Sequence, residues 1–405
     1  MWWPSACWAC RTPPDMTRPL TDDQRLLQDS AREFFAERAP VKALRADRAA
    51  GRPFDPALWK EVAALGFAGA AIPEAYGGSG MGWRSLGLVL EAAGRTLVAS
   101  PLLQSALVGV AAIETLGSDA QRAAWLPAIA AGEMTTALGL DEGAHHAPSR
   151  IAMRAVREPG GWRLEGQKRF VPDGATASHL LIAALVAPTL DAPEGLSLFC
   201  VAGSADGLVR KPLAMADSRG MADLDLTAVR VADDAVLGSV GEAASALEGV
   251  LDTARIGLAA EMLGAADALF ALTLDHLKTR RQFGQPIGAF QSLQHRAARM
   301  FVDLELTRSC VLAALDALDD AAGVSTSVRS AAAQGASLAS LASLAKARAG
   351  DTLHLVSNEA VQLHGGVGMT DAYDAGLYLK RARVLETLYG TAGWHRDRSA
   401  RLDGY

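Results

Sequence analysis

Cysteine is scarce in this chain of 405 residues, which holds only Cys7, Cys10, Cys200 and Cys310. Four scattered cysteines cannot form the dense disulfide framework of small secreted domains, so we expect a reducing, cytoplasmic setting. Cys7 and Cys10 have C-x-x-C spacing, but no second Cys or His pair follows at the distance that a zinc site needs. The sequence therefore predicts no metal site.

A basic excess and a long charge-free apolar run are also missing. The formal net charge is −6 at pH 7, whereas nucleic-acid-binding proteins usually carry a basic excess. A membrane-spanning helix needs about 18 or more consecutive apolar residues, and we find no such run without charge. We expect neither a nucleic-acid partner nor a membrane span.

Hydrophobic residues make up 50% of the chain, enough to bury a large core. A length of 405 residues predicts about two to three domains. Residues 1–15 hold three of the eight tryptophans and lack both the basic start and the apolar core of a signal peptide. We expect this segment to be a disordered leader, with Met16 as the true start.

Hydrophobic periodicity divides the remaining chain into three parts. Residues 16–132 read as helical, with capping boxes at Thr21 and Ser118 and an N-cap at Asp55. Residues 133–240 carry short strand-length runs, including a hairpin around Glu158. Residues 241–405 read as helical again, with helices expected over 249–277, 291–315, 327–349 and 351–363. The predicted fold is α+β, mainly α, ending in a four-helix bundle.

The segment Arg280-Arg-Gln-Phe-Gly-Gln-Pro-Ile287 joins two of the expected helices, and Gln291 opens the second. Gly284 and Pro286 explain the break, and cations at a helix C-terminus are favourable by about 0.3–1 kcal/mol, so a charged cap is the simpler interpretation. The functional interpretation is a guanidinium that binds a pyrophosphate, because its planar fork suits phosphate oxygens.

The segment Gln362-Leu-His-Gly-Gly-Val-Gly-Met-Thr370 follows a helix. A Rossmann phosphate loop needs a strand before its glycines, so that interpretation is excluded. A glycine cap and turn is the simpler explanation, but three glycines exceed what a cap needs and allow a large ligand to approach the backbone. A third segment, Leu164 to Asp173, lies on an expected strand, where we expect Lys168 to be solvated.

These three segments, in this order and in a helical–β–helical layout, resemble the acyl-CoA dehydrogenase family of flavoproteins from about Met16 onward. The resemblance implies an N-terminal helical domain over 16–132, a β-barrel domain over 133–240 and a four-helix bundle over 241–405. It also implies a homo- or hetero-tetramer, with FAD bound where the domains meet and partly across a subunit interface. The implied reaction is α,β-dehydrogenation of an acyl-CoA thioester, with an electron-transferring flavoprotein as acceptor.

The resemblance also implies roles for individual positions. Arg280 and Gln291 would contact FAD, with Phe283 packing nearby, and Gln362, Gly365 and Gly366 would receive the FAD of a neighbouring subunit. Thr391 would contact FAD in the terminal turn, and Phe170 and Val171 would lie against the flavin ring. Asp252 and Arg255 would lie beside the acyl pocket. Their i,i+3 spacing places both on one helix face, where a surface ion pair of little energetic value is the simpler interpretation.

The sequence departs from the family where the reaction needs a base. Tyr389 stands in the place of the family's glutamate, and Ala254 stands in the second place that some members use. A tyrosine with its ordinary pKa of about 10 is a poor base near neutrality, although the backbone N–H at 389 could still polarise the thioester oxygen. Two further departures are Pro172, in place of a threonine near the flavin edge, and Asp141–His146, in place of a flavin-contacting motif.

Several hypotheses remain open. The chain could be a dehydrogenase with a displaced base, for which Glu386, Asp371 and Asp374 are candidates. It could be one subunit of a heteromeric dehydrogenase whose partner supplies the carboxylate, a hypothesis that the two missing bases favour. It could also be a flavin monooxygenase with the same fold or a non-catalytic subunit. The acyl chain cannot be read from these motifs, and we expect the His145-His146 pair to lie on a loop surface.

Overall fold

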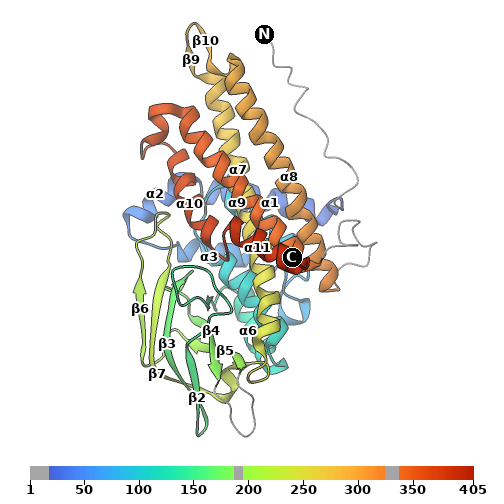
Figure 1. Cartoon of the computed structure of the whole chain (residues 1–405), viewed down its shortest axis with the longest axis vertical. Coiled ribbons are helices and arrows are strands. Elements are labelled where there is room, and N and C mark those ends of the chain that lie inside the picture. The colour runs from blue at the N-terminus through green and yellow to red at the C-terminus, as the bar shows by residue number, and fades with distance from the viewer. Residues whose placement is uncertain (1–17, 187–194, 324–336) are drawn as a thin grey trace.

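The computed structural model describes residues 18–186, 195–323 and 337–405. The expected leader, Cys7, Cys10 and the first part of the helix predicted over 327–349 lie outside the described residues. The described chain is mainly helical, with one mixed β-sheet that occupies one end of the elongated molecule (Figure 1).

The N-terminal region is built from short helices, three of which begin at clear capping signals. They are α1 (Asp22–Arg38), α2 (Val41–Ala49), α3 (Pro56–Ala64), α4 (Gly82–Arg95), the π-helical segment η2 (Leu102–Gly109), α5 (Val110–Leu116) and α6 (Asp119–Ala130). Both predicted capping boxes are confirmed, because Thr21 and Ser118 each accept the N3 backbone N–H. The Asp55 side chain likewise caps α3.

The middle region forms one mixed sheet with the strand order β6-β7-β3-β2-β4-β5-β8, and β1 pairs with β4. The strands are β1 (Thr136–Gly139), β2 (Arg154–Glu158), β3 (Gly161–Val171), β4 (His179–Val186), β5 (Gly195–Ala202), β6 (Leu208–Pro212), β7 (Ala222–Ala232) and β8 (Val236–Leu237). The predicted hairpin is confirmed as the antiparallel pair β2–β3. Among the described strands no ladder joins β6 to β8, so the sheet is an open path where a barrel was expected.

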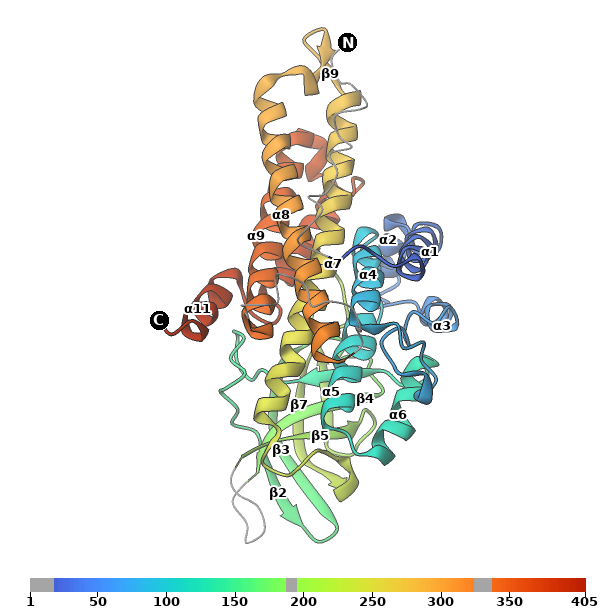
Figure 2. The same ribbon diagram turned by 90° about the vertical axis from the view of Figure 1, so that its right-hand side faces the viewer.

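Three long helices dominate the C-terminal region: α7 (Ala243–Thr279), α8 (Gln291–Ala321) and α9 (Leu338–His364). They pack side by side, and the shorter α10 (Ala375–Thr387) and α11 (Ala392–Leu402) pack on α9 (Figure 2). A small hairpin, β9 (Arg281–Gln282) with β10 (Gln285–Pro286), joins α7 to α8 at the end farthest from the sheet (Figures 1 and 2).

The prediction of two separate helices over 327–349 and 351–363 was wrong, because α9 runs through Gly350 without a break. A glycine inside a helix costs only about 1 kcal/mol relative to alanine. Packing of both halves of α9 on α7 and α8 outweighs that cost.

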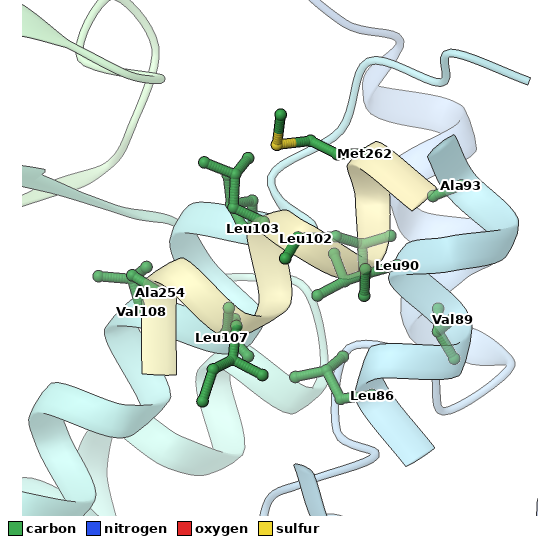
Figure 3. Packing of buried hydrophobic residues seen from close by; sticks show 14 of the residues in the cluster. Leu86, Val89, Leu90, Ala93, Leu102, Leu103, Leu107, Val108, Ala254 and Met262 are labelled. Atoms are coloured by element: carbon green, nitrogen blue, oxygen red, sulfur yellow. The ribbon is translucent and has the colours of Figure 1, made fainter. Parts of the chain in front are cut away.

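Helix α7 joins the N-terminal region to the long helices. A Cβ on Gly264 of α7 would lie 1.9 Å from the Glu91 carbonyl oxygen of α4, and a Cβ on Gly94 of α4 would lie 2.1 Å from that of Glu261. The two backbones therefore approach as closely as glycine allows. Figure 3 shows the core beside this contact, which Leu86 and Leu90 of α4, Leu103 and Leu107 of η2 and Met262 of α7 help to build.

Helix α7 also has a window of mean hydropathy 1.5 with at most two charged residues, long enough to cross a membrane by length and composition. However, 78% of that window is buried inside the protein, as in the core helix of a large domain. The absence of a membrane span stays a prediction.

Candidate active site

Tyr389 lies in the tight turn between α10 and α11 and points into the protein, with only 5% of its surface exposed. Its backbone has a positive φ of 55°, which side-chain-bearing residues rarely adopt. The next residue must be glycine, because a Cβ on Gly390 would lie 2.7 Å from the Trp394 ring. The turn is therefore built to hold position 389 in one conformation.

Two buried side chains, those of His395 and Lys346, hold this turn by hydrogen bonds to its backbone. His395 Nε2 donates to the Tyr389 carbonyl oxygen at 3.1 Å, and Lys346 Nζ donates to the Gly390 carbonyl oxygen at 3.0 Å. Burial lowers the pKa of His395 to about 2 and that of Lys346 to about 7. Both side chains donate to backbone carbonyl oxygens and so hold the turn in place.

The Tyr389 phenol reaches across to η2. Gln104 Nε2 donates to Tyr389 Oη at 2.6 Å, and Gln104 is itself buried. Burial raises the pKa of Tyr389 well above its ordinary value. The phenol is therefore neutral at physiological pH and cannot act as a base.

The expected pair Asp252 and Arg255 is a buried pair, so its interpretation as a surface ion pair was wrong. The Arg255 side chain is 0% exposed, and its Nη1 donates to Asp252 Oδ1 at 2.8 Å and to Glu248 Oε1 at 2.7 Å. Arg398 of α11 also binds both carboxylates. The Arg255 guanidinium lies 4.9 Å from the centroid of the Trp394 ring, a cation–π contact.

His146 extends this network into the β region, although sequence reasoning placed it on a loop surface. Its side chain is buried, with Nε2 3.3 Å from Arg255 Nη2 and Nδ1 2.9 Å from Asp141 Oδ2. Arginine can only donate, so Nε2 accepts and Nδ1 donates to Asp141. The segment that replaces the family's flavin motif therefore connects the sheet to α7, while His145 is exposed as expected.

Lys168 of β3 is also buried, so the prediction of a solvated side chain was wrong. It is 0% exposed, and its Nζ donates to the Leu140 carbonyl oxygen at 3.0 Å and to Glu142 Oε1 at 2.6 Å. The tertiary structure brings Glu142 against this face of β3, which the sequence did not predict. Among the described residues, no group of three or more His, Cys, Asp or Glu side chains could hold a metal ion.

A small pocket opens beside Gln104. It lies between η2, the turn after β3, the segment before β7 and α10, and is lined by Ser100, Leu103, Gln104, Pro172, Asp173, Asp217, Arg219, Met221, Arg381, Val384 and Leu388. Burial raises the pKa of Asp173 to about 7. Arg381 pairs with Asp217 at 2.6 Å and with Glu261 at 2.7 Å, so its charge is already compensated.

The three carboxylates proposed as displaced bases are engaged elsewhere. Asp371 pairs with Arg48 and Asp374 with Arg45 of α2. Glu386 pairs with Arg383 on its own helix at 2.9 Å. None of these three is among the residues that line the pocket beside Gln104. Nearness in the sequence to Tyr389 did not bring their side chains to it.

The positions expected to contact FAD fall into two groups. Arg280, Phe283 and Gln291 lie at the exposed tip of α7 and α8, and Phe283 is 89% exposed. Gln362, Gly365 and Gly366 lie at the end of α9 and are also exposed. The rings of His276 and His364 are 4.3 Å apart, so the structure brings these two motifs to the same end of the molecule.

The second group lies beside Tyr389 and the sheet. Thr391 caps α11 through its side chain, which accepts the Trp394 N–H at 3.2 Å. Phe170 ends β3 with a positive φ of 50° and is 43% exposed, whereas Val171 is buried. Arg280 lies 25 residues after Arg255 on one helix, about 37 Å along its axis at 1.5 Å per residue. The two groups of residues expected to contact FAD therefore lie far apart within one chain.

Gln104 and the buried roles of His146 and Lys168 were not identified from the sequence. The breaker-free apolar run around Gln104 contained a signal, because a glutamine among buried leucines needs hydrogen-bond partners. No local signal distinguishes buried His146 from its exposed neighbour His145.

Comparison with known proteins agrees with this geometry. The acyl-CoA dehydrogenase N-terminal domain model matches residues 21–133, and the C-terminal domain model matches residues 243–402. The chain is 31% identical over 385 residues to the 3-sulfinopropanoyl-CoA desulfinase of Paraburkholderia xenovorans, covering 92% of this chain and 94% of the relative. It is 28% identical to the mitochondrial isovaleryl-CoA dehydrogenase of Solanum tuberosum, covering 92% and 88%.

Among solved structures, the chain is similar to the Tcur3481-Tcur3483 steroid ACAD, with 32% identity and a TM-score of 0.81. That likeness covers 94% of this chain and 97% of the other. The motifs, the arrangement of helices around the sheet and these likenesses agree, and the chain belongs to the acyl-CoA dehydrogenase family.

Proposed function

We propose that this chain takes part in the FAD-dependent α,β-dehydrogenation of an acyl-CoA thioester, as one subunit of a heteromeric enzyme. Family membership and the dehydrogenase names among its relatives support the reaction. The similar steroid ACAD is named with two designations, Tcur3481 and Tcur3483, which supports an assembly of two kinds of chain. An electron-transferring flavoprotein is the proposed acceptor. The observation that carries the proposal is the neutral, buried Tyr389 at the family's base position.

The residues at the tip of the molecule that are expected to contact FAD fit that cofactor. The Arg280 side chain is exposed and makes no hydrogen bond or ion pair with another described side chain, and the nearby Phe283 ring, 89% exposed, contacts Phe290 at one edge. A Cβ on Gly365 or Gly366 would meet nothing within 4 Å, so the backbone there is open to a ligand. Bound FAD would accept the hydride that leaves the β-carbon of the acyl group.

The distance between the two groups suggests how subunits share the cofactor. Phe170, Val171 and Thr391 would hold the flavin end, whereas Arg280 lies at the tip, about 37 Å along α7 from Arg255. We propose that the tip of one subunit completes the FAD site of another. A tetramer built this way gives each exposed cation and each open glycine a ligand.

The residues around Tyr389 would orient the thioester. The backbone N–H of Tyr389 donates no hydrogen bond to another described residue, and the strained turn holds it in place. This N–H would polarise the thioester carbonyl oxygen, as an oxyanion-hole donor does. Arg255, fixed by Asp252 and Glu248, would shape the adjoining wall and exclude water.

The base is the missing part. The second family position, Ala254, is buried in the core beside Val108 of η2 (Figure 3). Glu386, Asp371 and Asp374 are held in ion pairs outside the pocket. We infer that a partner subunit supplies the carboxylate that removes the α-proton, because a base must lie within hydrogen-bond reach of that proton.

An anaerobic titration tests this proposal. The full chain is loaded with FAD and mixed with a panel of acyl-CoA thioesters, alone and after co-expression with candidate partner chains from the same family. We expect flavin absorbance to stay oxidised with the chain alone and to bleach with the correct partner. Bleaching by the chain alone would show that it carries its own base.

A second candidate function comes from the desulfinase among the relatives. Loss of sulfinate from 3-sulfinopropanoyl-CoA would be detected as sulfite release under the same conditions. Sulfite release without flavin bleaching would favour this function over dehydrogenation. The names of these relatives do not favour the flavin monooxygenase hypothesis.

A further inference from the structure

The orientation of the Gln104 amide decides which hydrogen Tyr389 can use. Gln104 Oε1 accepts the Leu138 backbone N–H at 3.3 Å, and only the oxygen of an amide side chain can accept an N–H. Nε2 is therefore the atom that faces Tyr389, where it donates to Oη at 2.6 Å. The phenol oxygen acts as the acceptor in this pair, so its own hydrogen is not used there.

The Tyr389 hydroxyl hydrogen has no acceptor among the described residues. The side chain is 95% buried, since only 5% of it is exposed. A buried donor without an acceptor is unfavourable, and native proteins rarely leave one without a ligand or water. Because burial keeps the phenol protonated, the hydrogen is available over the whole physiological pH range.

The small pocket adjoins Tyr389 through Gln104, and its wall combines apolar side chains with charged ones. Gln104 forms part of the wall of the small pocket, together with Asp173, Asp217, Arg219 and Arg381. A plain alkyl chain placed against these groups would remove water from them and give no hydrogen bond in return. An oxygen on an acyl group that lies beside Gln104 and Tyr389 would accept the hydrogen that the hydroxyl leaves unused.

We propose that the acyl group of the substrate carries an oxygen that accepts a hydrogen bond from Tyr389 Oη. The substrate class is thus an oxygenated acyl-CoA, with a hydroxyl or keto oxygen along the acyl chain. Tyr389 then determines the substrate specificity. The tyrosine at this position cannot act as a base, but it can donate this hydrogen bond. The inference rests on the proposed function, because it assumes that an acyl group enters beside Tyr389.

Binding of matched thioesters to the FAD-loaded full chain tests the proposal by isothermal titration calorimetry, which does not require turnover. The probes are hexanoyl-CoA and hexanoyl-CoA derivatives with one hydroxyl moved along carbons 3 to 6. We expect at least one hydroxylated isomer to bind about tenfold more tightly than hexanoyl-CoA, the gain of one satisfied hydrogen bond. A chain that prefers none of the isomers would overturn the proposal.

Tyr389→Phe removes the hydroxyl and keeps the ring, so it should abolish the preference and bind the hydroxylated isomers and hexanoyl-CoA equally, within about twofold. Tyr378→Phe is the matched control, because Tyr378 is another buried tyrosine of α10 whose hydroxyl already donates to the Arg95 carbonyl oxygen. It should keep the preference. A preference that survives in Tyr389→Phe would contradict the assignment.

Gln104→Glu provides a second variant that retains every hydroxyl. A carboxylate at 104 accepts the Tyr389 hydrogen, so the preference for the oxygenated isomer should disappear as it does in Tyr389→Phe. Flavin bleaching is recorded in parallel. Bleaching after co-expression with a partner chain is the separate test of the proposed dehydrogenation. Selective binding without that bleaching would sink the dehydrogenation and leave the specificity intact, whereas that bleaching without selectivity would do the reverse.

Discussion

The two ends of helix α7 have opposite characters. Near its start, Asp252 and Arg255 are buried and pair with each other, and Glu248, Arg398 and His146 add further ion pairs and hydrogen bonds. At its far end, Arg280 caps the helix, and its exposed side chain makes no hydrogen bond or ion pair with another described side chain. Both arginines fall at positions that the sequence assigned to function.

The contrast shows which parts of the site this chain completes by itself. The start of α7 is preorganised, because its charged groups are held by neighbours before any ligand arrives. The tip has exposed apolar and cationic groups that gain partners only from a ligand or another subunit.

Replacing Arg255 by methionine should lower the free energy of unfolding by about 3 kcal/mol, because it removes two buried charge-assisted hydrogen bonds and leaves Arg398 alone to pair with Asp252 and Glu248. Replacing Arg280 by methionine in the same chain should change it by less than about 0.5 kcal/mol without FAD, as for other exposed sites. Urea denaturation of the two variants measures both values. Equal effects would remove the distinction between the two ends.

Alanine substitutions of glycine should also cost more stability in the turn at Tyr389 than at the exposed tip. Gly390→Ala forces a Cβ against Trp394 at a positive φ of 106° and should cost about 2–3 kcal/mol. Gly366→Ala meets open space and should cost less than about 0.5 kcal/mol, yet weaken FAD binding. Thermal unfolding and flavin titration separate the two outcomes, and a stable Gly390→Ala variant would contradict the rigid turn.

Stability should respond to pH through the buried region. Burial raises the pKa of Asp173 to about 7 in the folded protein, so between about pH 4 and pH 7 the folded state binds more protons than the unfolded state. Its contribution to stability is therefore lost as the pH rises through this window. Asp173→Asn should raise the melting temperature more at pH 8 than at pH 5.

Asp275→Asn provides the control for this pH effect, because Asp275 lies near the exposed end of α7. Its melting temperature should follow that of the unchanged protein at both pH values. A pH profile that Asp173→Asn leaves unaltered would show that another group dominates, and Glu114, whose pKa burial also raises to about 7, would be examined next.

The smallest expected effect concerns FAD affinity at the tip. Arg280→Ala should weaken FAD binding about tenfold, the value of about one charge-assisted hydrogen bond to phosphate. The loss should shrink as the salt concentration rises, because the contact is exposed and screened. Flavin fluorescence at two ionic strengths measures it, and an affinity equal to that of the unchanged chain would exclude Arg280 from the FAD site.

Local signals in the sequence predicted the elements better than the site. The capping boxes at Thr21 and Ser118 and the β2–β3 hairpin were predicted because each depends on a few neighbouring residues. The break expected at Gly350 was wrong, since packing on α7 and α8 outweighs the cost of one glycine.

The burial of the site residues could not be predicted from local sequence signals. Lys168 and His146 have the composition of surface residues, and only Glu142, Asp141 and Arg255, brought close by the fold, make their burial possible. The positions of Asp252 and Arg255 were expected from the family resemblance. Their energetic weight follows from Arg398, which lies more than a hundred residues away in the sequence.

The central claim is that this chain binds FAD and an acyl-CoA but lacks a base at position 389. The most direct test compares the unchanged chain with Tyr389→Glu and with Tyr389→Gln, which is similar in size but has no carboxylate. Each is loaded with FAD and mixed anaerobically with the thioester that binds most tightly. The account predicts flavin bleaching only in Tyr389→Glu. Bleaching of the unchanged chain at the same rate would contradict it.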